Sequence, residues 1–520
     1  MNSYLFVVSS GGIQNGAHVL NRRISEELAR GHAVHMITLG ESFERPGIGV
    51  SEWRLEDLDG AQREELNSTF PYVDRWPLRF QHHLEGKGPA ELGLPENPEA
   101  FTAVIGFGDT TTPGALMIRD RFYPGARVGS IITMDPEALE TALGDPEMGR
   151  YRAWHQGTLF QHADLVIAHG PKSGLDAERL MERAGEPGGG RTPIHTFIPG
   201  NSVEGPAPAP RSRDEPMEVL MLGRMGDPNK GAIDVARAVG QMRRQGYDQV
   251  RLTLQGVDQA EMADFSRTLD EEVGPGWHDF VEVREFSDSR ERLDAVIDRS
   301  HVMAMASESE AYGLAAAEAA SRGKPVVVAK GNGNGFAVLM EDERFIPAEA
   351  GSRLVIDDSG SVSHLGNTMG EAGSSGVDRY KLFARKLIDV HDDPEKYHEA
   401  ALVVREALRG YSDRDAAQSL DTAVSYVRQG GTLDTLQRPG GETEVVSPGQ
   451  GEGMVADTGR GLLRDGPPRV AERGGDPSPS MSADRLLSAG ASGPPVSRSS
   501  DGGGRRSHGP GQERDQGIGY

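Results

Sequence analysis

The chain has 520 residues, a length that indicates two or three domains. Its net charge of −24 disfavours nucleic acids and anionic membrane surfaces as partners, and the absence of cysteine excludes disulfides and thiolate chemistry. The N-terminus lacks the basic region and long apolar core of a signal peptide, and no apolar run reaches membrane-spanning length. We therefore expect a soluble, cytoplasmic protein.

The first 200 residues alternate short apolar segments with segments of helical period. Residues 4–9 predict a strand that ends at Gly11 and Gly12, and residues 17–30 predict the helix that follows. Strands alternating with helices favour a parallel sheet. Further strands are expected at residues 33–38, 103–106, 127–133, 163–168 and 194–198.

A proline-rich segment at residues 205–210 predicts a stiff linker. The alternation then restarts, so the fold class is α/β with a second domain and a cleft between the two. In this half we expect strands at residues 218–222, 250–255, 281–283 and 301–306, and helices at 232–243, 314–321, 378–390, 394–408 and 413–428.

Beyond residue 430 the chain is rich in Gly, Pro, Ser and Arg and has no sustained apolar period, which helps to explain a hydrophobic fraction of only 36%. Such a segment buries too little apolar surface to offset its ordering entropy, so we expect a disordered tail. The predicted organisation is an N-terminal domain at 1–205, a C-terminal domain at 206–410, a closing helix at 411–430 and a tail at 431–520.

Gly11 and Gly12 lie between the first strand and the first helix, where missing side chains let backbone amides approach a phosphate or a sugar. The sequence there matches neither a dinucleotide-binding fingerprint nor a P-loop. A tight strand-to-helix turn explains the pair equally well.

Arg224 and Lys230 follow the first strand of the second half and precede a helix. A planar guanidinium and a compact ammonium group at one strand end can neutralise a diphosphate. The alternative is a pair of solvated surface charges.

Glu310 and Glu318 flank the expected start of the helix at 314–321. The backbone amides of Gly313 and Leu314 would point from that helix start toward an anion, while the two carboxylates accept hydrogen bonds from hydroxyl groups. This combination suits a nucleotide sugar. The alternative is an acidic helix start stabilised by the helix dipole.

At these residues the chain resembles the GT-B glycosyltransferases, in particular the retaining enzymes of family 4. The resemblance covers roughly residues 1–430, and its C-terminal half is the more specific. It is carried by Gly11-Gly12, Ala163-Asp164-Leu165-Val166-Ile167-Ala168, Ile198-Pro199-Gly200-Asn201, Gly223-Arg224, Lys230-Gly231, Glu310-x-Tyr312-Gly313-Leu314-x-x-x-Glu318 and Gly323-x-Pro325.

The resemblance implies roles for these residues. Arg224 and Lys230 would hold the donor diphosphate in place of a metal ion, and Glu310 would contact the donor sugar. Glu318 would hold the ribose, while Tyr312, Gly313 and Leu314 lie at the nucleotide. No cofactor and no metal site are expected.

On the acceptor side the sequence departs from the family, because many relatives place a histidine where residues 131–135 end in an aspartate. Asp135 is therefore the candidate catalytic residue of this side, and Asp109 is a second cleft candidate. His169 follows a strand, and we interpret it as a structural histidine.

The expected activity is retaining transfer of a sugar from a nucleoside diphosphate, UDP-GlcNAc or UDP-glucose, to a small soluble acceptor. Residues 1–205 hold 18 basic and 28 acidic residues, which favours a cationic, polyhydroxylated acceptor, such as an aminoglycoside-type intermediate of antibiotic biosynthesis, and disfavours membrane work. Two alternatives stay open: a sugar-nucleotide epimerase of the same fold, and a non-catalytic binding protein. The sequence does not predict the oligomeric state.

Overall fold

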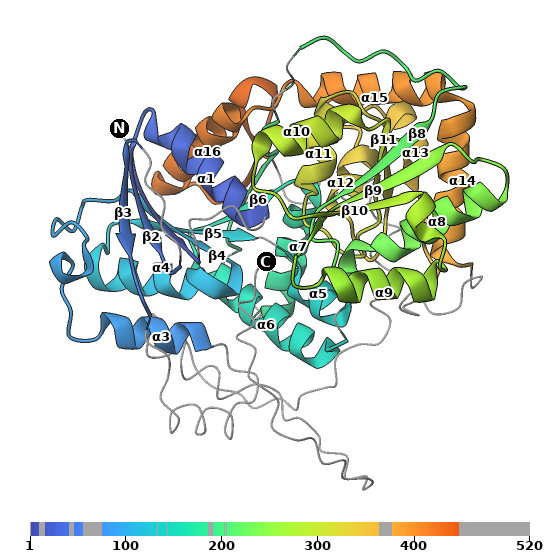
Figure 1. The fold of residues 1–520 in the computed structure, drawn as a ribbon. Coiled ribbons are helices and arrows are strands. Elements are labelled where there is room, and N and C mark those ends of the chain that lie inside the picture. Colours follow the sequence, from blue (N-terminus) through green and yellow to red (C-terminus); the bar gives the residue numbers. More distant parts are fainter. Residues whose placement is uncertain are drawn as a thin grey trace, which may run out of the picture.

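Two α/β domains, each built on one sheet, form the described part of the chain (Figure 1). A computed structural model describes residues 2–9, 16–40, 46–55, 75–132, 134–142, 144–185, 191–201, 203, 205–362 and 377–446. The predicted pair of α/β domains with parallel sheets is confirmed. Within the described residues, no helix is both long and apolar enough to span a membrane.

The sheet of the first domain has, among the described residues, nine strands in the order β15-β14-β7-β6-β5-β4-β1-β2-β3. Their pairing is parallel, except that β15 runs antiparallel to β14. Strands β4 and β6 are buried throughout, as expected of a parallel sheet covered on both faces. The strands are β1 Ser3–Val8, β2 Ala33–Thr38, β3 Ile48–Glu52, β4 Ala103–Phe107, β5 Arg127–Ile132, β6 Leu165–His169, β7 Ile194–Phe197, β14 Asp434–Gln437 and β15 Thr443–Val446.

The second domain has a smaller sheet, with described strands in the order β10-β9-β8-β11-β12-β13, all parallel. The order reverses beside β8, so β8 and β11 present their carboxyl ends at a switch point, where α/β sheets bind ligands. The strands are β8 Met217–Leu222, β9 Val250–Val257, β10 Val281–Glu285, β11 Val302–Met305, β12 Val326–Ala329 and β13 Val355–Ile356.

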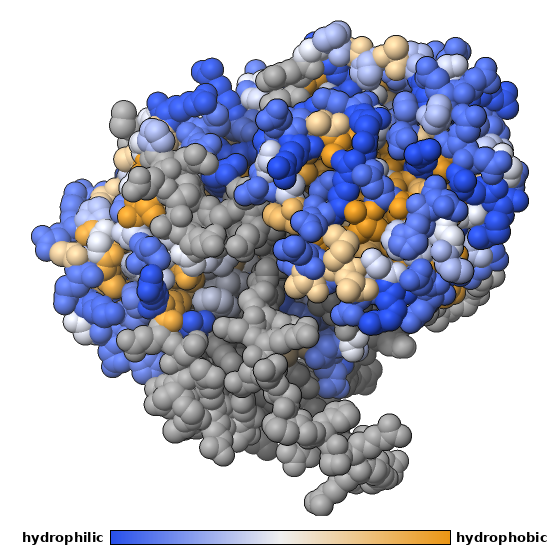
Figure 2. All heavy atoms as spheres, viewed as in Figure 1, coloured by the Kyte–Doolittle hydropathy of each residue, from blue (hydrophilic) through white to orange (hydrophobic). Residues whose placement is uncertain are grey.

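Helices cover the sheets and bury their apolar faces against them. In the space-filling view hydrophilic side chains dominate the visible face, and hydrophobic ones form small separate patches (Figure 2). The α-helices are α1 Gly16–Ala29, α3 Arg75–Leu84, α4 Gly108–Phe122, α5 Pro136–Ala142, α6 Pro146–His162, α7 Pro171–Ala184, α8 Ala232–Arg244, α9 Met262–Glu272, α10 Arg290–Arg299, α11 Leu314–Ser321, α12 Gly335–Glu341, α13 Ala348–Leu354, α14 Arg379–Asp392, α15 Pro394–Leu408 and α16 Asp413–Arg428. Short 3₁₀ turns are η1 Ala90–Leu92, η2 Pro228–Lys230, η3 Trp277–Asp279 and η4 Pro439–Gly441.

The chain returns to the first domain at α16, which lies beside α1 (Figure 1). Ser412 and Asp415 form a capping box that starts the helix. Farther along, the Asp421 carboxylate accepts a hydrogen bond from Asn2 Nδ2 at 2.8 Å and another from the Tyr4 hydroxyl. Helix α16 is thereby fastened to the first strand of the chain.

The tail starts later than the sequence predicts. Instead of disorder from residue 431, the chain adds β14 and β15 to the first sheet, with β14 parallel to β7. The Asp434 carboxylate accepts a hydrogen bond from the Ile194 amide at 2.8 Å, and Gln437 accepts one from the Ile198 amide at 2.8 Å. The rest of the predicted tail, residues 447–520, lies outside the described residues.

Asp413, the first residue of α16, gives a test of how α16 packs against the first domain. Burial raises its pKa to about 6, against the opposing effect of Arg23. Since the folded-state pKa is raised, the stability contribution of this group is present below pH 4 and is lost as the pH rises through about 6. We expect Asp413→Asn to stabilise the protein by roughly 1–2 kcal/mol at pH 7. The same substitution should have little effect at pH 4, and thermal unfolding of both proteins between pH 4 and 8 measures the difference. A Tm difference independent of pH would contradict this assignment.

Candidate functional site

A cleft of ≈ 320 Å³ lies between the two domains. The first domain lines it with residues of α1, with Met134 and with His169 at the end of β6. The second domain lines it with the carboxyl ends of β8 and β11 and the start of α11. The cleft brings together seven of the residues singled out in the sequence: Arg224, Lys230, Glu310, Tyr312, Gly313, Leu314 and Glu318.

Buried Asn229 fixes the two loops of the second domain to one another. Its side chain donates to the Ser309 carbonyl at 2.9 Å and accepts from the Ser309 amide at 2.9 Å, and its own carbonyl accepts from the Glu308 amide at 2.8 Å. The Asp227 carboxylate in turn accepts a hydrogen bond from the backbone amide of Asn229 at 3.0 Å. Three hydrogen bonds between the same two segments leave little freedom for the side chains that follow. Asn229 was not predicted as a site residue, although its place directly before Lys230 was a signal.

Lys230 and Glu310 form an ion pair across these two loops. Lys230 Nζ lies 2.6 Å from Glu310 Oε2, and the side chains are 17% and 16% exposed. The Ser307 hydroxyl is 3.4 Å from the same carboxylate oxygen. An ammonium group and a carboxylate held side by side in a cleft offer, respectively, a charge for a phosphate and an acceptor for sugar hydroxyls.

Arg224 lies in the loop after β8, where its guanidinium is 3.3 Å from the Asp227 carboxylate. Its side chain is 44% exposed, so it has room to turn toward a ligand in the cleft. The structure therefore places two cations, Arg224 and Lys230, at the same end of the cleft.

The helix α11 starts at the cleft. Gly313 precedes it with a φ of +91°, a left-handed conformation that favours glycine. The first amides of the helix have no acceptor within it, which makes them available to an anion. Tyr312 is buried, its ring lies against Gly170 of the first domain, and burial raises its pKa. Tyr312 thus packs the domains together as well as lining the cleft.

Glu318 is held from both domains. Its Oε1 is 2.9 Å from Arg23 Nη2 of α1 and 2.8 Å from Arg290 Nη1 of α10, and its side chain is 14% exposed. Neither arginine was predicted, because both are charged helical residues far from Glu318 in sequence. Both ion pairs use Oε1, and no described residue pairs with Oε2, which can therefore accept from a ligand.

Asp135, the residue predicted for catalysis on the acceptor side, is buried within the first domain. It is 2% exposed, its carboxylate is paired with Arg179, and it also accepts a hydrogen bond at 3.1 Å from the Glu137 amide at the start of α5. The Asp109 carboxylate is likewise paired with Arg152, whose Nε lies 2.7 Å from Asp109 Oδ2. Both carboxylates are tied into the first domain, and neither lines the cleft.

His169, which the sequence suggested to be a structural histidine, is buried in the cleft wall. Burial lowers its pKa to about 4, although nearby Glu310 acts in the opposite direction, so the imidazole is neutral at pH 7. Gly11 and Gly12, predicted to bind phosphate, lie outside the described residues.

Residues 8–420 match the family model described as family 4 glycosyltransferase in conflict systems. The chain is a family 4 glycosyltransferase. A comparison with curated protein sequences gave no match for this glycosyltransferase.

Solved structures share its GT-B fold, as the sequence predicted. Sucrose-phosphate synthase from Thermosynechococcus elongatus is 17% identical, with a TM-score of 0.58 over 82% of this chain and 100% of that one. HepE from Anabaena, in complex with UDP and glucose, is 14% identical with a TM-score of 0.55 over 82% and 100% of the two chains. An E. coli trehalose-6-phosphate structure bound with UDP-2-fluoro glucose is 12% identical, with a TM-score of 0.54 over 82% and 99%. At these low sequence identities, the similarities show a shared fold alone.

Proposed function

We propose that this glycosyltransferase moves a sugar from a UDP-sugar, UDP-glucose or UDP-GlcNAc, to a small soluble acceptor with retention of anomeric configuration. The observation that carries the proposal is the pair Lys230–Glu310, 2.6 Å apart, in one cleft with Arg224 and Glu318. Similarly folded HepE holds UDP and glucose in its structure, which supports a UDP-sugar donor.

In this proposal each donor-side group has one task. Arg224 and Lys230 bind the diphosphate and neutralise the charge that develops when the bond from the anomeric carbon to the phosphate oxygen breaks. The acceptor hydroxyl forms the new bond on the same face, and its proton passes to the leaving diphosphate. Glu310 accepts hydrogen bonds from the donor sugar, Glu318 from the ribose, and the amides at Gly313 and Leu314 meet a phosphate.

Two cations at the diphosphate also support transfer without a metal ion. We expect activity to persist in the presence of a chelator, which initial rates with and without EDTA would measure.

The acceptor is proposed to be cationic and polyhydroxylated, such as an aminoglycoside-type intermediate of antibiotic biosynthesis, in the cytoplasm. The support is the acidic balance of residues 1–205, with 18 basic and 28 acidic residues. Mass spectrometry of a UDP-sugar panel with cationic, neutral and thiol acceptors tests donor and acceptor together. Neutral polyols outcompeting every cationic acceptor would overturn the acceptor class. A new sugar nucleotide formed without acceptor would instead indicate epimerisation.

The contact between Arg23 and Glu318 gives a test of the ribose assignment. Arg23 holds one oxygen of Glu318 at 2.9 Å and so presents the other to the ribose hydroxyls. We expect Arg23→Ala to raise the KM for the donor about five-fold and to leave kcat within about two-fold, because the lost hydrogen bond acts on binding. Arg30→Ala is the control. Arg30 directly follows the same helix and its side chain is 73% exposed, so this substitution should change neither kcat nor KM. An unchanged donor KM in Arg23→Ala would exclude this role.

A further inference from the structure

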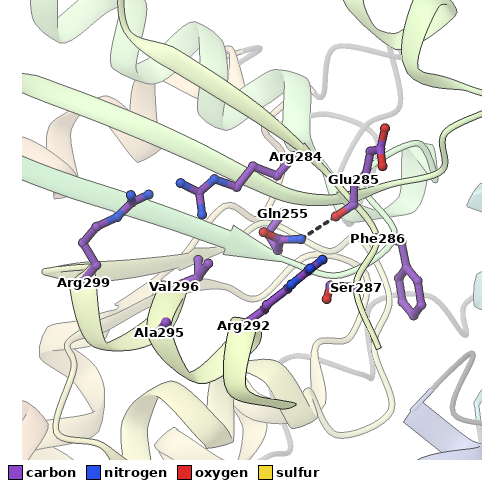
Figure 3. A pocket seen from close by; sticks show the side chains of 9 residues that line it. All are labelled: Gln255, Arg284, Glu285, Phe286, Ser287, Arg292, Ala295, Val296 and Arg299. Atoms are coloured by element: carbon purple, nitrogen blue, oxygen red, sulfur yellow. Dashed lines mark hydrogen bonds between the residues drawn. The ribbon is translucent and has the colours of Figure 1, made fainter. Parts of the chain in front are cut away.

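A second cavity, of ≈ 540 Å³, adjoins the interdomain cleft at the edge of the second sheet. Three arginines surround it: Arg284 at the end of β10, and Arg292 and Arg299, seven residues apart on one face of α10. Figure 3 shows their side chains around the space beside Gln255 and Val296. We call this cavity the arginine bowl.

Among the described residues, positive charge in the arginine bowl exceeds the negative charge beside it. Arg284 Nε lies 2.8 Å from Glu282 Oε1, and Arg299 Nη2 lies 3.3 Å from Glu282 Oε2, so two guanidinium groups share one carboxylate. In the described part of the chain no carboxylate pairs with Arg292. The Glu285 carboxylate points away from the space between the arginines (Figure 3). A positive cluster in a chain of net charge −24 is a local reversal, and an anion between the guanidinium groups would relieve their repulsion.

The other lining groups suit a ligand with phosphate and apolar parts. Guanidinium forks match phosphate oxygens. Val296 provides an apolar wall, and the Phe286 side chain is 48% exposed at the border with the interdomain cleft. The Ser287 hydroxyl oxygen accepts from the Ser289 amide at 3.2 Å, which leaves its proton for a ligand.

We propose that the arginine bowl is a second anion site, which binds the phosphate groups of a small phosphorylated molecule. It is separate from the diphosphate site of Arg224 and Lys230. The two sites share Gln255, Phe286 and Ser287 in their walls, so a molecule in the bowl contacts the loop that borders the donor. The proposal goes beyond sugar transfer and does not require the donor to be UDP-linked.

Inorganic pyrophosphate is the probe, and isothermal titration of the full chain is the measurement. We expect two binding sites in the wild type, of which Lys230→Ala removes one and Arg292→Glu weakens the other at least ten-fold. The double variant should retain only the weakened second site. A single site that is lost in Lys230→Ala, or a second site that is unchanged in Arg292→Glu, would overturn the proposal. Sugar transfer by Arg292→Glu is measured in a separate assay. Because pyrophosphate binding needs no turnover, the binding result does not depend on the proposed sugar transfer.

Two further variants separate a built site from general surface charge. Arg267→Glu on α9 makes the same charge change at a side chain that is 66% exposed and outside both cavities, and it should leave both sites intact. Ala295→Trp keeps all three arginines and fills the space between them, so it should remove the second site. Equal weakening by Arg267→Glu and Arg292→Glu, or unchanged binding in Ala295→Trp with a wild-type melting curve, would contradict a built site.

Discussion

Lys230→Ala is expected to lower the rate of sugar transfer about 1,000-fold, equivalent to about 4 kcal/mol of activation free energy. The Lys230 ammonium lies in the cleft at 2.6 Å from Glu310, in a loop that Asn229 fixes. Its charge faces a diphosphate whose negative charge increases as the sugar departs, so the interaction is strongest in the transition state. We therefore expect kcat to fall much more than KM rises, measured as initial rates of product formation by mass spectrometry.

Two variants control this result. Lys381→Ala removes a lysine that is 47% exposed, lies outside the cleft and is paired with Asp378 at 2.7 Å, so the rate should stay within about two-fold. Lys230→Arg keeps the charge but not the compact shape of the ammonium group, and its rate should fall between those of the wild type and Lys230→Ala. Transfer by Lys230→Ala at the wild-type rate would show that the diphosphate binds elsewhere.

The donor wall of the cleft could be predicted from the sequence because each of its residues belongs to a local pattern. Arg224 and Lys230 follow one strand, while Glu310 and Glu318 flank one helix start. Parallel strands place the loops at their carboxyl ends on the same edge of a sheet, so β8 and β11, as neighbours, bring the two patterns together.

The partners that orient these residues could not be predicted in the same way. Arg23 reaches Glu318 from the other domain, and nothing in the period of α1 distinguishes it from a solvated charge. The surroundings of Asp135 could not be predicted for a related reason. Its place at a strand end suggested chemistry, but Arg179, from a different helix, takes its carboxylate. Side-chain pairing between elements depends on packing that a local pattern does not encode.

The added strands β14 and β15 could not be predicted from the composition of their segment. Each has four residues, too few for an apolar period to emerge from a Gly- and Pro-rich segment. β14 is held by its pairing with β7, including the bond from the Ile194 amide to Asp434, and β15 is held by its antiparallel pairing with β14. A strand added at a sheet edge needs few apolar residues of its own.

Arg379, at the start of α14, supports the donor wall from behind. Its side chain is fully buried, and its Nε lies 2.8 Å from Asp358 Oδ2 while its Nη1 lies 3.8 Å from Asp234 Oδ2. The same Nη1 donates to the Ala306 carbonyl at 2.7 Å, directly after β11 and two residues before Glu308, the partner of Asn229. One guanidinium thus connects the end of β11 with two buried carboxylates.

Arg379→Met is accordingly expected to destabilise the second domain by about 3–5 kcal/mol, because it leaves the Asp358 carboxylate buried without the guanidinium that pairs with it at 2.8 Å. For a domain of this size the loss corresponds to a fall in Tm of roughly 10 °C, measurable by calorimetry. Arg267→Met, which removes an exposed pair with Asp264, should cost less than about 0.5 kcal/mol. Adding Asp358→Asn to Arg379→Met removes the charge that has lost its partner and should recover part of the loss. A wild-type Tm in Arg379→Met would mean that the Asp358 carboxylate does not depend on this guanidinium, and that the end of β11 is held by its backbone alone.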